Sequence, residues 1–261
     1  MPNDSAITTS VRATVSAEEW QARIDLAACY RLLARYNMAD LTGTHTSLSV
    51  PGSDNKHFLI NPHGVLFERV TASSLVKIDC DGRIVGESQY PVNPAGFVIH
   101  SAIHMGQPHL TCVLHSHAPG GVAVSCMKEG LLPLSQHSLI LMGWLAYHDY
   151  EGVALDEDER TRIVRDLGEC RLLILRNHGL LTVGESVGEA FVWMHRLEKA
   201  CKWQISTLSA GRELNPLSDV VQKRSVEQGL AMFRKGGPYA CGREWPSLLE
   251  ELRRAGSDHW Q

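Results

Sequence analysis

Short apolar runs alternate along this chain with stretches that repeat every three to four residues, and this alternation limits the fold more than any other feature. Runs typical of buried strands fall at residues 48–50, 57–60, 75–78, 110–115, 138–142 and 171–175. Helical patterns fall at residues 16–36, 96–105, 120–128, 156–167 and 187–208. Strands that alternate with helices pack as layers around one core. The sequence therefore predicts a layered α/β domain.

Local signals set the limits of this domain. Ser16 followed by Glu19 predicts a capped helix start, and Asp81-Gly82 predicts a hairpin between residues 75–78 and 83–85. Residues 1–15 are polar and aperiodic, which predicts a flexible N-terminal tail. From about residue 212 the chain is polar but keeps several aromatic residues. We therefore expect one domain over residues 16–261, with an ordered C-terminal appendage.

Charge and composition exclude two classes of partner. The 261 residues include 29 acidic and 25 basic side chains, for a formal net charge of −4, and no basic run could follow a phosphate backbone. We expect no nucleic-acid partner. No apolar stretch approaches the roughly 18 residues of a membrane span, and no secretory signal is present. We expect no membrane partner, a cytoplasmic protein and reduced cysteines, since the seven cysteines form no C-x-x-C pair.

Three histidines predict a metal centre. His115 and His117 are two residues apart at the end of an apolar run, and the strand period of two places both imidazoles on one face. His178 follows the apolar run at 171–175, where side chains from separate strands can converge. Three neutral imidazoles with an open fourth position are typical of a catalytic metal site.

A second histidine pair competes with this interpretation. His100 and His104 have the i, i+4 spacing that places two rings on one helix face, as in H-E-x-x-H zinc helices. Ser101 stands where such a helix carries its glutamate base, which weakens the metal interpretation of this pair. Four other histidines can be satisfied core or surface residues: His45, His63, His137 and His148.

The order of several blocks resembles the class II aldolase and adducin superfamily over residues 17–211. The blocks are residues 43–49 (GTHTSLS), 59–64 (LINPHG), 71–75 (TASSL), 94–104 (PAGFVIHSAIH), 113–118 (VLHSHA), 130–137 (GLLPLSQH) and 175–181 (LRNHGLL). The resemblance implies a three-layer α/β/α class II aldolase-like single domain and a homotetramer. It also implies a divalent metal held by His115, His117 and His178, with zinc first and Fe(II), Mn or Co as alternatives.

Two positions depart from the pattern of that family. The aldolases carry a glutamate acid/base four residues before the histidine that matches His100, and this chain has Gly96 there. Their first block usually ends Ser-x-Arg, whereas Ser49 stands in place of the arginine. A phosphorylated sugar is therefore not assured as the substrate. Adducins resemble the chain in other segments but have lost the metal histidines, which this chain retains.

These observations predict a divalent-metal-dependent carbon–carbon lyase, aldolase-like or a decarboxylase. Its substrate would be a small hydroxy- or oxo-acid or a sugar-type compound, cleaved through a metal-stabilised enediolate. Gly96 disfavours a conventional aldolase more than a decarboxylase, because loss of carbon dioxide needs no base to take a hydroxyl proton. Two alternatives stay open: a non-haem Fe(II) oxygenase that performs oxidative decarboxylation, and a non-catalytic adducin-like binding protein.

Polar residues at turns complete the predicted site. Hydroxyls and backbone N–H groups at turns and helix starts suit a substrate carboxylate or phosphate, although the same residue types also populate ordinary turns. The predicted substrate-binding residues are Thr44, His45, Ser47, His63, Gly64 and Asn93. The residues that could move a proton in place of the missing glutamate are His45, Tyr147 and Tyr150.

Overall fold

A mixed β-sheet forms the centre of the computed structural model, which describes residues 11–152 and 159–261, except for the side chains at 94–98. Within these residues seven strands form one sheet in the order β3-β2-β1-β4-β7-β6-β5. All neighbours are antiparallel except the parallel pair β5 and β6. The strands are β1 Thr46–Ser49, β2 His57–Ile60, β3 Val76–Asp79, β4 Cys112–Ser116, β5 Leu145–His148, β6 Leu172–Leu175 and β7 Gly179–Gly184.

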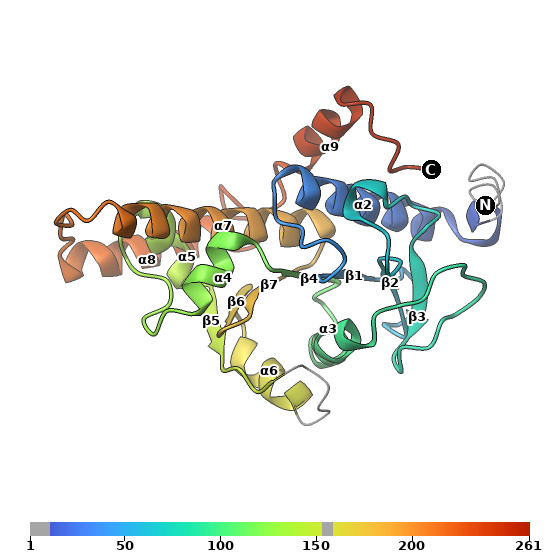
Figure 1. The fold of residues 1–261 in the computed structure, drawn as a ribbon, viewed down its shortest axis with the longest axis horizontal. Helices are drawn as coiled ribbons and strands as arrows, with labels where there is room; N and C mark the ends of the chain where they lie inside the picture. Colours follow the sequence, from blue (N-terminus) through green and yellow to red (C-terminus); the bar gives the residue numbers. More distant parts are fainter. Residues whose placement is uncertain (1–10, 153–158) are drawn as a thin grey trace.

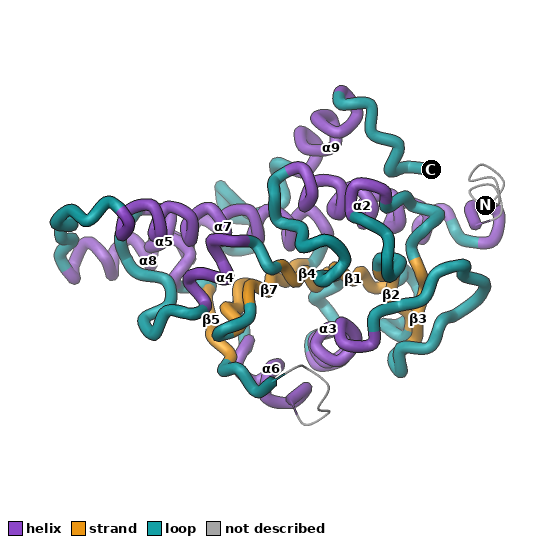
Figure 2. Tube along the Cα trace, in the orientation of Figure 1, coloured by secondary structure: helices purple, strands orange, loops and turns teal. Residues whose placement is uncertain are grey.

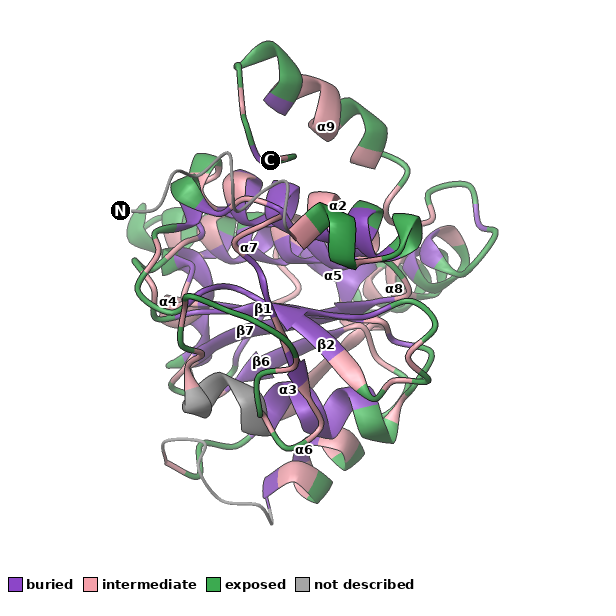
Figure 3. Ribbon diagram, turned by 90° about the vertical axis from the view of Figure 1, so that its right-hand side faces the viewer, coloured by how far each residue is buried: buried purple, intermediate pink, exposed green. Residues whose placement is uncertain are grey.

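Helices cover both faces of this sheet (Figure 1). The larger core lies between the sheet and α2, α4 and α7, and a smaller one lies between the sheet and α3 and α6. A third apolar cluster consists of residues from β2 and β3. Figures 2 and 3 show the strands between these two helical layers. The predicted three-layer α/β/α architecture is therefore confirmed. The helices are α2 Ala17–Arg35, η1 Phe67–Arg69, α3 Pro94–Gly106, α4 Pro119–Ser125, α5 Gln136–Met142, α6 Glu159–Leu167, α7 Val187–Ser209, α8 Asp219–Phe233 and α9 Trp245–Arg254.

Helix α2 begins where its capping residue predicts. The Ser16 hydroxyl accepts a hydrogen bond from the backbone N–H of Glu19 at 3.1 Å. The carboxylate of Glu19 does not complete the predicted capping box, because it pairs with Arg23 and Lys77. The predicted hairpin is reduced to a turn at Asp81 with a single bridge between Ile78 and Ile84.

The strand predicted at residues 138–142 is wrong, because this segment is helix α5. Ser135 and Ser138 cap the helix start reciprocally through their side chains and backbone N–H groups. The segment reads as a continuous apolar run because α5 packs against both α7 and α8. A short run buried on several sides lacks the periodicity that separates helix from strand. The strand beside β6 is β5 instead.

The chain after residue 212 packs against the helices and one loop of the domain. Gly229 of α8 packs directly on the backbone of Ile140 in α5. Helix α9 lies over α2 in Figure 1, and the last residues pair with the loop after η1, where the N–H of Ala72 donates to the carbonyl of His259 at 2.8 Å. Of the predicted N-terminal tail, residues 1–10 lie outside the described residues and residues 11–14 are helical. No helix in the described part of the chain is long and apolar enough to cross a membrane.

Candidate metal centre

The strand register collects the predicted site residues at one end of the sheet. β1 and β4 run antiparallel, and the backbone N–H of His115 donates to the carbonyl of His45 at 3.0 Å. β4 also pairs antiparallel with β7, which places His178, in the turn before β7, beside the end of β4. β2 runs antiparallel to β1, so the turn that contains His63 and Gly64 follows at the same end. The backbone pairing thus builds the site.

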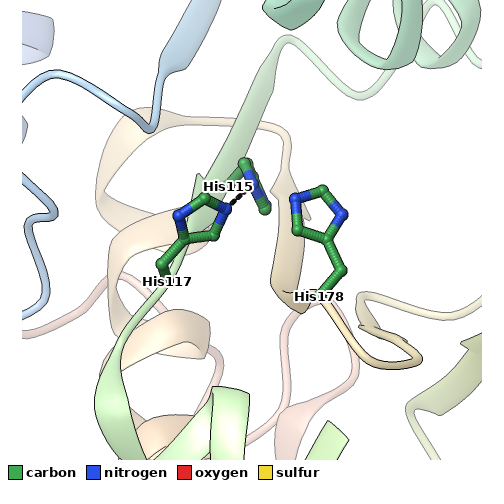
Figure 4. A group of neighbouring side chains, drawn as sticks. All are labelled: His115, His117 and His178. Atoms are coloured by element: carbon green, nitrogen blue, oxygen red, sulfur yellow. Dashed lines mark hydrogen bonds between the residues drawn. The ribbon is translucent and has the colours of Figure 1, made fainter. Parts of the chain in front are cut away.

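His115, His117 and His178 form one cluster (Figure 4). One ring nitrogen from each histidine lies within 4.8 Å of the other two. The Nε2 atoms of His115 and His117 are 3.0 Å apart. The ring centroid of His178 lies 4.7 Å from that of His115 and 5.0 Å from that of His117. The three side chains come from the end of β4 and from the turn between β6 and β7, as the sequence predicted.

Hydrogen bonds hold two of these rings in the tautomer that a metal needs. The Nδ1 atom of His115 lies 3.0 Å from the carbonyl of Leu180, and a carbonyl can only accept, so Nδ1 donates and Nε2 keeps its lone pair. The Nδ1 atom of His117 donates in the same way to the carboxylate of Asp40 at 2.8 Å. A ligand histidine is commonly oriented by such a partner. Both Nε2 lone pairs therefore face the centre of the cluster.

Asp40 was missed in the sequence because it lies outside the spaced histidine pattern. It lies in the loop after α2, 77 residues from His117. The sequence feature that could have pointed to Asp40 is its position just before the block at residues 43–49. A carboxylate in a loop has many ordinary roles, so only the fold singles it out.

His115 and His178 are neutral near pH 7, which suits cation binding. Burial lowers the pKa of His115 well below its usual value, and the neighbouring histidines lower it further because positive charges repel one another. Burial and then His117 lower the pKa of His178 to about 4. Neutral imidazoles are the ligand form that zinc and related divalent ions bind. The three residues fit a divalent transition metal with at least one position open for a substrate.

The two predicted tyrosines have different surroundings. Tyr150 is exposed, and its ring centroid lies 6.5 Å from that of His178. Tyr147 lies opposite Ile174 in the β5–β6 pair and packs with it in the larger core. Its hydroxyl accepts the backbone N–H of Leu131 at 3.0 Å. Since alternate residues of a strand face opposite sides of the sheet, these contacts favour a packing role for Tyr147.

The predicted substrate-binding residues also differ in their surroundings. Thr44 is buried, and its hydroxyl has no hydrogen-bond partner among the described residues. Leaving such a group unpaired costs about 1–3 kcal/mol, so its position favours a ligand contact. His63 and Gly64 are exposed in the turn after β2, and Asn93 directly precedes α3. Ser47 differs from these residues, because its buried hydroxyl is already bonded to two histidines.

The competing pair on α3 does not form a second metal cluster in the described residues. The Nδ1 atom of His100 and the Nε2 atom of His104 lie 2.6 and 2.7 Å from the Ser47 hydroxyl. That hydroxyl lies between the two rings, where a shared metal would lie. His45 bonds the remaining nitrogen of His100 at 2.7 Å. The nitrogens therefore serve an internal network.

Comparison with known proteins identifies the family. Residues 24–205 match the family model described as "Class II Aldolase and Adducin N-terminal domain". This chain belongs to the class II aldolase and adducin family. The resemblance inferred from the sequence blocks is thereby confirmed.

The similar proteins include both class 2 aldolase proteins and adducins. A Caulobacter vibrioides protein grouped with the class 2 aldolases is 48% identical over 97% of each chain. Alpha-adducin of Rattus norvegicus is 49% identical over 72% of this chain, but the match covers only 26% of the adducin. An aldolase II superfamily protein from Pseudomonas syringae has a TM-score of 0.90 and 49% identity over 97% of this chain and 100% of its own. An L-fuculose 1-phosphate aldolase from Glaciozyma antarctica has a TM-score of 0.78 and 29% identity over 94% of both chains.

Proposed function

We propose that this chain is a divalent-cation-dependent carbon–carbon lyase acting on a small hydroxy- or oxo-acid. The observation that carries the proposal is the geometry of the histidine cluster. Two of the three imidazoles have their Nδ1–H groups held by Leu180 and Asp40, so their Nε2 lone pairs converge. A converging and partly exposed set of three imidazoles is typical of an open catalytic metal site.

His115, His117 and His178 would hold the cation, and zinc is the first candidate. A divalent cation bound there would act as a Lewis acid on adjacent substrate oxygens as the neighbouring carbon–carbon bond breaks. A substrate with a carboxylate next to a carbonyl or hydroxyl suits such a site, because two of its oxygens can bind together. We also propose that the chain assembles as a homotetramer, as the family resemblance implies.

The chain's own residues would bind and orient this acid. The unpaired Thr44 hydroxyl can donate to the substrate carboxylate. The backbone N–H of Gly64 and those in the first turn of α3, after Asn93, can attract an anion. The N–H of His63 already donates to the carbonyl of Pro91 at 2.9 Å, so His63 would contribute only its side chain. Tyr150, beside His178, can donate a proton to the product.

Phosphorylated ketoses should be poor substrates despite the likeness to an L-fuculose 1-phosphate aldolase. Gly96 has no group that can exchange a proton, and Ser49 has no positive charge for a phosphate. A general acid/base contributes about 10²- to 10⁴-fold to a rate. We expect cleavage of fuculose or ribulose phosphates to be slower than in ordinary aldolases by a factor in this range.

The proposal is tested by metal analysis and by a substrate panel. The zinc-loaded protein should release carbon dioxide or a carbonyl product from a 2-oxo or hydroxy acid, with and without oxygen. His178→Ala should weaken metal binding by more than about the 10- to 100-fold typical of outer partners, whereas the exposed His109→Ala should not. Full metal occupancy in a His115→Ala/His178→Ala double variant would contradict the assignment. A reaction that requires iron and stops without oxygen would replace the lyase by an oxygenase.

The likeness to alpha-adducin supports a second candidate, a non-catalytic binding protein. The two functions make different predictions for the metal-loaded chain. A lyase turns over a small acid, whereas an adducin-like protein binds a macromolecular partner and leaves every acid in the panel intact. The second result would overturn the enzyme proposal.

A further inference from the structure

A groove along α7 lies apart from the metal centre. Its volume is about 320 Å³, which is at the lower end of the range for small-molecule sites. Helix α7 supplies most of the lining residues, and the end of α2 and the starts of α5 and α9 supply the others. These helices lie on one side of the sheet (Figure 1). No lining residue belongs to the metal cluster or to the predicted substrate-binding set.

Side chains one helical turn apart build the groove. His195, Lys199 and Trp203 follow one another at intervals of four residues, so they lie on one side of α7. Each interval advances about 6 Å along the helix axis. The solvent side of a helix usually carries charged and polar residues. Here two ring side chains stand on either side of the lysine, and the tryptophan is 37% exposed.

Aromatic rings form both ends of the groove. At one end the ring centroid of His195 lies 5.1 Å from that of Tyr36 and 6.5 Å from that of Phe191. At the other end the ring centroid of His137 lies 4.2 Å from that of Trp203. The sequence left His137 between a core and a surface role, and the fold places it on this wall. Flat walls of this kind favour a ligand with an aromatic ring.

The groove carries more positive than negative charge. Among the described residues that line it, Glu244 is the only acidic one, and its Oε1 atom already pairs with Arg196 Nη2 at 2.6 Å. The Lys199 ammonium lies 5.8 Å from the ring centroid of Trp203 and has no carboxylate partner in the described part of the chain. The ring nitrogens of His195 have no hydrogen-bond partner there either. A cation and an imidazole are thus available to an anion.

The same charge acts on both histidines of the groove. Burial lowers the pKa of His195, and the nearby cations, Lys199 first, lower it further. Burial and then Arg196 and Lys199 lower the pKa of His137. A bound anion would offset the repulsion among these groups, whereas a bound cation would add to it.

We propose that this groove binds a small organic anion that carries an aromatic ring. The ring would stack on Trp203 beside His137, and the anionic group would accept hydrogen bonds from the Lys199 ammonium and from the N–H of His195. One ring with a short anionic group spans these positions, since they are one helical turn apart. Aryl carboxylates and nucleoside monophosphates share this chemistry. The site shares no residue with the metal centre, so it stands or falls independently of the lyase function.

Isothermal titration calorimetry of the zinc-loaded chain tests the site with four probes. Adenosine monophosphate has a ring and a phosphate, and indole-3-acetate has a ring and a carboxylate. Adenosine lacks the charge, and inorganic phosphate lacks the ring. At least one of the two ring-bearing anions should bind about tenfold or more tightly than both adenosine and phosphate, because only it uses the charged and the aromatic contacts together. The tighter of the two identifies the class of ligand.

Substitutions of exposed side chains locate the bound probe. Lys199→Gln should weaken its binding by about 10- to 100-fold, because a hydrogen bond to a charged group is lost, and Lys199→Arg should keep most of the affinity. Trp203→Leu should weaken binding by about 2- to 10-fold through the loss of stacking. Lys223→Gln removes an exposed charge from α8 outside the groove and is the matched control. Zinc affinity should be the same in all four variants.

Three results would overturn the proposal. In the first, neither ring-bearing anion binds more tightly than adenosine and phosphate, which is also expected if a second copy of the chain covers the groove. In the second, Lys199→Gln and Trp203→Leu bind the probe as the wild type does. In the third, His178→Ala abolishes binding of the probe, which would place the probe at the metal centre instead.

Discussion

At the residue scale, the contact between Asp40 and His117 connects a loop to the metal centre. The carboxylate is about half exposed, with 54% of the side chain open to solvent. Its contribution to folding is small, because a contact at a half-exposed carboxylate competes with water. Its effect on the imidazole is larger, since it fixes which nitrogen carries the proton.

Asp40→Ala should weaken zinc binding by about 10- to 100-fold, because the His117 ring loses the partner that orients it. Asp40→Asn keeps an acceptor oxygen and should lose less. Asp81→Ala removes an exposed carboxylate far from the cluster and serves as the control. Competition with a chromophoric chelator measures the affinities. Zinc affinity in Asp40→Ala within twofold of the wild type would rule out this role.

At the element scale, α4 and β7 are in close contact beside the site. A methyl group on Gly121 of α4 would lie 2.3 Å from the buried side chain of Leu180. The carbonyl of Leu180 is the acceptor that holds His115. A displaced β7 would therefore disturb both packing and the metal ligand.

Gly121→Ala should lower the free energy of unfolding by about 1–3 kcal/mol, as overpacked cores do, and should also weaken zinc binding. Leu180→Val removes a methylene from the contact, so the double variant should recover part of both losses. Denaturant unfolding and chelator competition on the four proteins give the coupling between the sites. Strictly additive losses would show that the two side chains do not meet as the structure describes.

At the scale of the whole molecule, buried histidines make stability depend on pH. Burial lowers the pKa of His45 and of His104 to about 3, and the pKa of His178 to about 4. In the unfolded chain these groups have a pKa of about 6.5. Below that pH the unfolded state binds more protons than the folded state, so acid favours unfolding. The stabilisation is complete above about pH 6.5 and is lost as pH falls toward 3–4.

We expect the free energy of unfolding of the metal-free protein to fall between pH 6.5 and 5. Each of these histidines contributes up to about 1.4 kcal/mol per pH unit. Urea unfolding at half-unit steps, with a chelator present, measures the slope. His104→Gln should reduce the slope by about one proton, whereas the exposed His109→Ala should change it little. A flat profile over this range would mean that the buried rings are already protonated in the folded state.

Many strands and helices could be predicted from the sequence, because the spacing of their apolar residues follows the period of the element. The strands at 57–60 and 171–175 and the helix from Ser186 follow patterns that each segment carries alone, since a strand repeats every two residues and a helix every 3.6. Segment α5 was misread because an apolar run enclosed by other helices has no polar face to reveal its period. Strand β5 was missed for a related reason, because residues 145–148 are recognised as a strand only from their pairing with β6.

The sequence alone determined the family, the layered α/β class and the three histidines, because these depend on residue type and short spacing. Only the tertiary structure decided which polar groups meet. In the folded chain Asp40 contacts His117, and Tyr147 packs in the core. His45 is linked to His104 through His100 and Ser47. These contacts link strands, loops and a helix that are 50 or more residues apart. Such pairings depend on sheet register and helix placement, which no local pattern encodes.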